Sequence, residues 1–308
     1  MSTESEPGPE SSKRNLLRLA LELGGVAAFK IMTGRNSKSE TTGEIQQPKK
    51  DFEPKPSWEQ DFSTLPDGPI DQAVWTYDTD PNVPGYNQEK QGYTRSQKNV
   101  RIEDGRLVIE AHRESYTYPD DQDRNYEITS ARIDTRKSFT FEYGKIEAKI
   151  KIPEGKGTWP AFWMLSANNP YTGSLDWDES DERFYMHDGE LDVMEAYGNS
   201  PGHIEATVHT HIKSQEMQVI LPNTKDGFHT YGVELTPAGI VWTLDDVPYY
   251  EVKKPSENSD EWPFGNGNRL YAILNLAMGG SGGGEIDPTK NMWRMETESI
   301  KFYEFIGK

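Results

Sequence analysis

The chain has 308 residues, a formal net charge of −18 and no cysteine. The absence of cysteine excludes a disulfide framework, a thiolate metal site and a cysteine nucleophile. Residues 1–56 contain nine Lys or Arg and eight Asp or Glu, so the remaining residues carry a charge of −19. A domain this acidic repels phosphate backbones, so we expect no nucleic-acid partner, whereas a neutral substrate is compatible with the charge.

The first 56 residues differ in composition from the rest of the chain. We predict that residues 1–56 form a disordered or low-complexity tail, because residues 1–12 are rich in Ser, Glu and Pro and residues 36–56 are polar, with lysines and prolines. Its apolar segment, residues 16–32, is interrupted by Arg18, Glu22 and Lys30 and falls short of the ~20 apolar residues that a spanning helix needs. We find no clear signal peptide. Contact with a membrane surface through residues 16–32 and a free tail are both left open.

From Trp58 onward, short apolar or alternating runs are separated by turn residues. In Tyr143–Ile152, for example, Ile146, Ala148 and Ile150 share one face and charged residues share the other. Further runs of this kind are Arg106–Glu110, Ile204–Ile212, Ile240–Leu244, Leu270–Ala277 and Ile300–Ile306. No long segment has a period of 3.6 residues, so the pattern predicts an all-β sandwich of antiparallel strands, formed by one domain over residues 57–308.

Three carboxylates lie close together in DGELDVMEAYG, at Glu190, Asp192 and Glu195. On a regular strand Glu190 and Asp192 share a face and Glu195 does not, but a β-bulge at Val193–Met194 would turn all three to one side. Glycoside hydrolysis needs one ionised and one protonated carboxyl, and a third acid between them can raise a neighbour's pKa. Spacing alone leaves two alternatives, a catalytic triplet and an acidic strand that faces solvent. A metal site is less well supported, because no histidine lies near the acids at metal-ligand spacing and His209 and His211 alone are weak candidates.

The same segment resembles glycoside hydrolase family 16, the family of laminarinases, lichenases, agarases and carrageenases. GELDVMEAYG matches the bulged form of the family signature, E-x-D-x-x-E. The blocks Ile128–Ser166, Phe228–Asp246 and Leu270–Gly280 also follow the family's sequence and order, and the resemblance extends from Trp58 to about Ile306. It implies a β-jelly roll of two curved antiparallel sheets, with the polysaccharide bound in a concave groove.

The resemblance also implies roles for individual residues. Glu190 would be the nucleophile, Glu195 the general acid/base and Asp192 their electrostatic partner. Substrate-binding residues would be Trp159 and Trp163 in KGTWPAFW, His209 beside the acid/base, the trio Asn87, Glu89 and Gln91, and Tyr185. For Trp163 a place in the core is the alternative, and for the trio an ordinary polar loop is. Tyr185 stands where laminarinase-type members usually have a tryptophan, within an acidic stretch at Asp176–Asp188, so the subsites there are expected to differ.

No cofactor is required for this chemistry, but many family members bind a structural calcium ion. Asp61 stands where the family has a Glu ligand, and Glu298 stands where the family has an Asp ligand. One side chain is therefore shorter and the other longer than in the family. The carbonyl of Gly105 would complete the shell. Calcium accepts oxygen ligands in flexible geometry, so two interpretations stay open: a calcium site of altered geometry, and ordinary surface carboxylates.

These features together predict a retaining endo-β-glycanase that cleaves a polysaccharide, with β-1,3-glucan (laminarin-type) as the expected substrate. The alternatives are a transglycosylase, an enzyme for mixed-linkage glucan, agar or carrageenan, and a non-catalytic glucan-binding module. Such modules typically lose the paired glutamates, and both are present here. We expect a monomer whose substrate class places it outside the cell or in the cell envelope.

Overall fold

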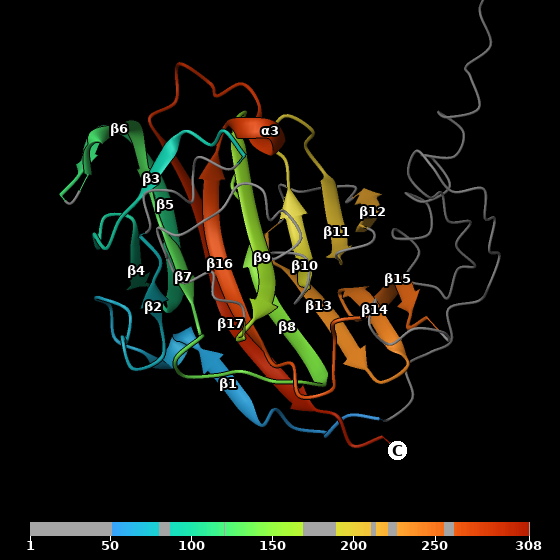
Figure 1. Cartoon of the computed structure of the whole chain (residues 1–308). Coiled ribbons are helices and arrows are strands. Elements are labelled where there is room, and N and C mark those ends of the chain that lie inside the picture. The colour runs from blue at the N-terminus through green and yellow to red at the C-terminus, as the bar shows by residue number, and fades with distance from the viewer. Residues whose placement is uncertain are drawn as a thin grey trace, which may run out of the picture.

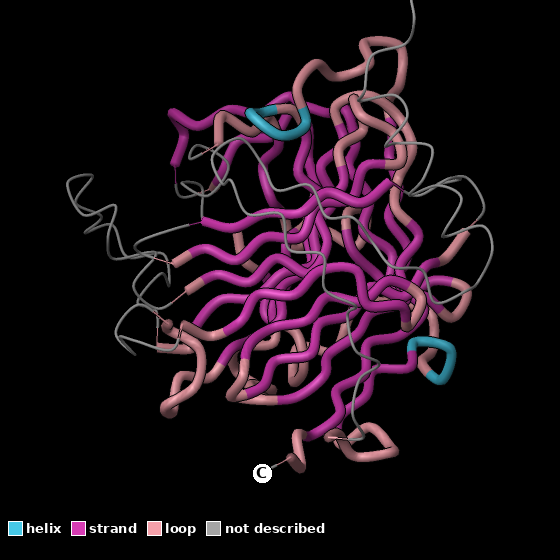
Figure 2. Tube along the Cα trace, turned by 90° about the vertical axis from the view of Figure 1, so that its right-hand side faces the viewer, coloured by secondary structure: helices cyan, strands magenta, loops and turns pink. Residues whose placement is uncertain are grey.

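The computed structural model describes residues 51–79, 87–119, 121–168, 189–210, 214–220, 227–255 and 262–307. Strands are the dominant secondary structure in this part of the chain, and loops and two short helices connect them (Figure 2). The strands form two sheets, as the alternating sequence pattern predicted, and the all-β sandwich is confirmed. The apolar segment at residues 16–32, Tyr185 and the acidic stretch at residues 176–188 lie outside the described residues.

One sheet has ten strands, in the order β15-β14-β13-β8-β17-β5-β6-β3, with β1 added on β17 and β4 on β5. Its strands are β1 (Trp58–Asp61), β3 (Gln91–Tyr93), β4 (Val100–Glu103), β5 (Arg106–Tyr118), β6 (Asp121–Ser130), β8 (Gly144–Lys151), β13 (His229–Thr236), β14 (Gly239–Leu244), β15 (Val247–Lys253) and β17 (Met292–Glu304). A short 3-10 helix, η1 (Phe62–Thr64), follows β1.

The other sheet has seven strands, in the order β12-β11-β10-β9-β16-β7-β2 (Figure 1). Its strands are β2 (Thr76–Tyr77), β7 (Arg132–Asp134), β9 (Thr158–Ser166), β10 (Glu190–Ala196), β11 (His203–His209), β12 (Ser214–Ile220) and β16 (Leu270–Met278). A single-turn helix, α3 (Gly280–Gly283), follows β16 and contacts β9. Among the described residues, no helix has the length and apolar character needed to cross a membrane.

The hydrophobic core lies between the two sheets. In β8, Ile146, Ala148 and Ile150 are fully buried, whereas Lys149 on the other face forms an ion pair with Glu298. The seven-stranded sheet contributes Leu191, Met194 and Ala206 among other apolar side chains to the same core. Since side chains alternate along each strand, the residues between these core positions face away from the ten-stranded sheet. We call this surface the outer face of the seven-stranded sheet.

Residues 51–56, which the sequence analysis assigned to the tail, include residues that pair with the end of the chain. Phe52 forms a β-bridge with Phe305, and their rings make an edge contact with centroids 5.8 Å apart. The backbone N–H of Ile306 donates to the carbonyl of Asp51 at 2.8 Å. The sequence rich in lysine and proline concealed this pairing, because backbone hydrogen bonds at a sheet edge require no particular side chain.

Candidate active site

A β-bulge in β10 turns the three predicted carboxylates to the outer face. Against β11, Glu190 pairs with His209 and Asp192 with Thr207, and the register then shifts so that Glu195 pairs with Glu205. Leu191, Val193 and Met194 are buried in the core. The predicted bulge at Val193–Met194 is therefore confirmed. It places an additional residue between Asp192 and Glu195, which restores the common face.

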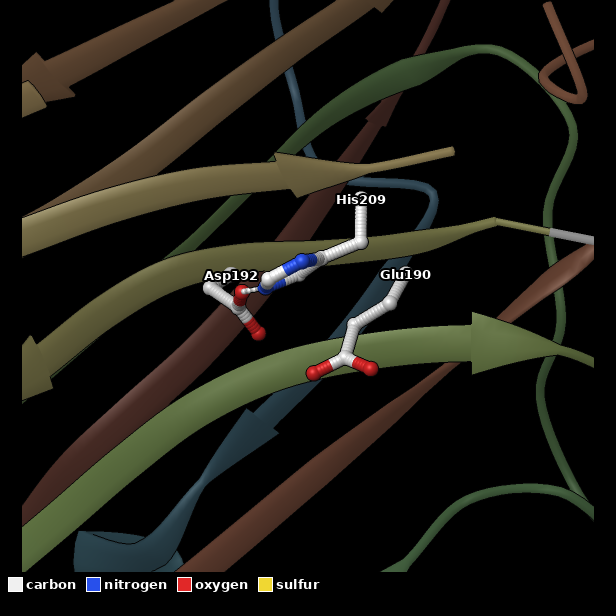
Figure 3. Close-up of side chains that lie close together, drawn as sticks. All are labelled: Glu190, Asp192 and His209. Atoms are coloured by element: carbon white, nitrogen blue, oxygen red, sulfur yellow. Dashed lines mark ion pairs between the residues drawn. The ribbon is translucent and has the colours of Figure 1, made fainter. Parts of the chain in front are cut away.

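Asp192 is held by two contacts at the centre of the triplet. Its Oδ2 atom lies 3.2 Å from Nε2 of His209, and its side chain is 3% exposed. Figure 3 shows this ion pair between β10 and β11, with the carboxylate of Glu190 beside it. The backbone is fixed as well, because the buried indole N–H of Trp242 on β14 donates to the Asp192 carbonyl at 2.7 Å. Asp192 therefore contacts its own sheet through His209 and the ten-stranded sheet through Trp242.

The electrostatics favour a site that retains protons. Burial, followed by the charges of Asp192 and Glu195, raises the pKa of Glu190 well above its usual value. Burial and the charge of Asp192 do the same to the pKa of Glu195. Burial lowers the pKa of His209, but its hydrogen bond to Asp192 and the charge of Asp192 raise the pKa by more, so the net shift is upward. One carboxyl of this group can therefore act as an acid near neutral pH.

Trp159 lies on β9 with its indole directed at the triplet. Its Nε1–H donates to Oε1 of Glu195 at 2.8 Å. The ring is packed against α3, since a Cβ atom on Gly282 would lie 2.5 Å from Trp159 Cε2. Only glycine permits this close approach. Trp159, which the family resemblance placed in the substrate cleft, therefore also touches the predicted acid/base residue.

Trp163 lies beside Asp192 in the β9–β10 register, also on the outer face. Its indole N–H donates to Oδ1 of Asn275 on β16 at 2.7 Å. The guanidinium of Arg132 on β7 stacks over the Trp163 ring, 4.7 Å from its centroid, and forms an ion pair with Asp78. Trp163 is half-buried and packs against the small apolar cluster around Tyr271, apart from the main core.

The predicted trio Asn87, Glu89 and Gln91 lies at the end of β16. Gln91 is fully buried, accepts from the backbone N–H of Met278 at 2.7 Å and donates to Oε2 of Glu89 at 2.6 Å. Burial raises the pKa of Glu89, although Gln91 and Arg132 lower it in part. The Asn87 carbonyl accepts from Ser281 N at 2.9 Å. Gln91 orients Glu89, and the Asn87 backbone anchors the loop of α3.

Several residues of this surface were absent from the sequence prediction. They are Arg132, Asn275, Tyr197, Glu205 and Gly282. The alternation of Ile204–Ile212 places Glu205 on the face of His209, so that pattern could have identified Glu205. No such signal existed for Asn275 or Gly282, because their places depend on the pairing of β16 with β9.

In the described part of the chain, two groups of residues were candidates for holding a cation. Ligand atoms of Glu190, Asp192 and His209 lie within 4.8 Å of one another, although Asp192 and His209 already contact each other. Since Asp192 and His209 already pair with each other, the arrangement does not require an ion to explain it.

The residues predicted to bind calcium are neighbours, but they contact other protein groups. Asp61 and Glu298 lie on the adjacent strands β1 and β17, and Gly105 packs against Ser63. Ser63 donates to Oδ1 of Asp61 from its hydroxyl at 2.6 Å and from its backbone N–H at 3.0 Å, which lowers the pKa of Asp61. Glu298 lies 2.7 Å from Nζ of Lys149. Calcium would have to displace these contacts, and its binding stays a prediction.

Closely spaced carboxyls with raised pKa values on the outer face of a β-sandwich, flanked by tryptophans, fit a glycoside hydrolase. Comparison with known proteins agrees with this class. Residues 87–287 match the model for "Glycosyl hydrolases family 16", and the chain belongs to that family. It is 34% identical to a β-glucanase from Rhodothermus marinus over 271 residues, which are 82% of this chain and 87% of the relative.

Solved structures agree with the family assignment. The laminarinase from Rhodothermus marinus has a TM-score of 0.69 and 31% identity, over 82% of this chain and 97% of that chain. A variant of LamA from Zobellia galactanivorans, in complex with laminaritriose and laminaritetraose, has a TM-score of 0.70 and 30% identity, over 82% of this chain and 99% of that one. The resemblance seen in the sequence and the jelly-roll fold that it implied are confirmed.

Proposed function

We propose that the protein is a retaining endo-β-glucanase that hydrolyses internal bonds of β-1,3-glucan, with Glu190 as nucleophile and Glu195 as general acid/base. The observation that carries the proposal is the bulge in β10, which brings Glu190, Asp192 and Glu195 to one face. The names of the relatives, a β-glucanase and a laminarinase, support the choice of a glucan.

In the first step the Glu190 carboxylate attacks the anomeric carbon and the glycosidic bond breaks. Glu195 gives its proton to the leaving oxygen, so the departing chain becomes an alcohol. In the second step Glu195, now ionised, removes a proton from water as the water attacks the glycosyl-enzyme, and Glu190 is released. The ion pair with His209 keeps Asp192 in place between the two glutamates throughout.

The test is a screen of purified enzyme on laminarin, mixed-linkage glucan, agarose and carrageenan, with product lengths and linkages identified. We expect laminarin to be cleaved fastest, with oligosaccharides of many lengths appearing early, as an endo enzyme produces. Glu190→Gln should fold and bind laminarin but lose several orders of magnitude in turnover, because no glycosyl-enzyme can form. Activity on agarose or carrageenan alone would overturn the choice of glucan.

A transglycosylase would use the same residues, so the screen is repeated with a high concentration of laminarioligosaccharide acceptor. Hydrolysis predicts that the initial products are shorter than the substrate. Products longer than the substrate, in greater amount than new reducing ends, would identify the protein as a transglycosylase.

A further inference from the structure

Two residues beside Glu195 have no part in the mechanism given above. Tyr197 follows Glu195 by two residues, just beyond β10, and Glu205 lies directly opposite Glu195 on β11. The Tyr197 hydroxyl lies 3.0 Å from Oε1 of Glu205 and 3.5 Å from Oε2 of Glu195. It therefore bridges two carboxyl groups, and the side-chain amide of Gln218 on β12 holds the other oxygen of Glu205.

The phenol has one hydrogen and can donate it to only one of the two carboxyls. The shorter distance assigns that hydrogen to Glu205. If the phenol donated to Glu195 instead, it would favour the ionised acid and lower the pKa of Glu195. With its hydrogen on Glu205, the Tyr197 oxygen has lone pairs toward Glu195 and can accept a hydrogen bond from the protonated acid. Burial and the nearby charges of Glu195 and Glu205 raise the pKa of Tyr197, so its own proton stays in place.

The charges at the two ends of the triplet differ in sign. Arg132 acts on Glu190 and lowers its pKa in part. Glu205 acts on Glu195 and adds to the rise that burial and Asp192 produce in its pKa. Like charges directly opposite each other on paired strands are destabilising, so this arrangement has a cost that one proton would relieve.

We propose that Glu205 and Tyr197 are positioning residues for the acid/base carboxyl, which keep a proton on Glu195 and hold the protonated oxygen beside the phenol. This inference rests on the proposed function. Arg132 stabilises the ionised form of Glu190 at the other end, and Trp159 fixes Oε1 of Glu195. The proton of the triplet is thereby assigned to the residue that must donate it.

Among the described residues of the strands that pack on β10, the groups that titrate or carry charge near Glu195 lie on β10, β11 and β12. They are Glu190, Asp192 and Tyr197 on β10 or just after it, Glu205 and His209 on β11, and Glu216 on β12. β9 contributes the neutral Trp159. Glu205 is the nearest of the acids outside the triplet, since Glu216 pairs with Thr207 and lies one strand further away.

The test is the pH dependence of kcat/KM on laminarin for the full chain and its variants. The alkaline limb of that profile reports loss of the Glu195 proton in the free enzyme. In Glu205→Gln the negative charge is gone, so this limb should move to lower pH by about one unit. The acid limb, which reports ionisation of Glu190, should move little. Glu205→Asp retains the charge and should keep the limb near its wild-type position.

Glu216→Gln is the matched control, because it removes an equal charge from the next strand without touching Tyr197. Tyr197→Phe removes the acceptor for the Glu195 proton and should also move the alkaline limb to lower pH. Because both residues act on one proton, the shift in the double variant should be smaller than the sum of the single shifts.

A substrate with an acidic phenol as leaving group needs no proton for bond cleavage, so its kcat/KM should show no such shift in Glu205→Gln. An alkaline limb that moves no further in Glu205→Gln than in Glu216→Gln would overturn the inference, with the proposed function intact. If the wild type cleaves no glucan, or if Glu190→Gln remains active, then the proposed function fails and the inference fails with it.

Discussion

Replacement of Trp159 by phenylalanine should raise the pKa of Glu195, whereas Glu205→Gln should lower it. The indole N–H donates to Oε1 of Glu195 at 2.8 Å, and this bond favours the ionised carboxyl. Phenylalanine retains an aromatic ring against Gly282 but has no N–H. The pKa of Glu195 should therefore rise further, and the alkaline limb of kcat/KM should move to higher pH.

The size of the shift follows from the bond that is lost. A hydrogen bond to a charged group contributes about 1.5–3 kcal/mol, and one pKa unit corresponds to about 1.4 kcal/mol. Because Glu195 and Trp159 are only half-buried, solvent weakens the effect and the lower end applies, about one pH unit. The position of the limb is independent of any loss in sugar binding, which changes KM at every pH.

Trp163→Phe is the matched control, since its N–H donates to the neutral Asn275 and not to a carboxylate. That variant should leave the limb in place even if it binds laminarin less well. A shift of the Trp159→Phe limb to lower pH, or equal shifts in the two tryptophan variants, would refute the account of how Glu195 keeps its proton.

Three further predictions concern stability. A carboxyl whose pKa is raised by folding stabilises the folded state below its unfolded pKa and loses that contribution as pH rises through the folded pKa. Glu190→Gln should therefore raise the melting temperature at pH 8 and change it little at pH 4. The control, Glu251→Gln on the exposed face of β15, should change the melting temperature at neither pH. An equal effect of Glu190→Gln at both pH values would contradict this prediction. Addition of millimolar calcium to wild type freed of metal by a chelator should raise its melting temperature, because an ion that binds only the folded state stabilises it. Asp61→Ala should abolish this increase, and no increase in the wild type would show that the site does not bind calcium. Finally, a chain beginning at Asp51 should melt like the full chain, and one beginning at Trp58 should melt a few degrees lower, because it lacks the pairing of Phe52 with Phe305; identical melting of the two would show that this pairing contributes nothing.

The sequence was sufficient for the fold and for the centre of the site, because both depend on local patterns. Alternation in Gly144–Lys151 determines which side chains enter the core, and the offset of Glu195 from Asp192 requires a bulge if the acids are to share a face. The predicted face and the bulge are both present.

The surroundings of the site could not be predicted in the same way. Asn275 reaches Trp163, and Gly282 packs on Trp159, only because β16 pairs with β9 in one particular register. The acidic partner of Glu195, Glu205, depends on the register of β10 with β11 across the bulge. Registers between distant segments follow from the packing of the whole sandwich, and a single sequence does not report them.

The central claim is that Glu190 forms the covalent bond to the sugar, and trapping tests it most directly. A laminarioligosaccharide donor with fluorine beside the anomeric carbon and fluoride as leaving group slows breakdown of the glycosyl-enzyme, so the intermediate accumulates. After proteolysis, mass spectrometry should find the sugar on the peptide that contains Glu190, on the Glu190 side chain itself. A sugar attached to Asp192 or Glu195, or an active enzyme that accumulates no labelled peptide, would contradict the account.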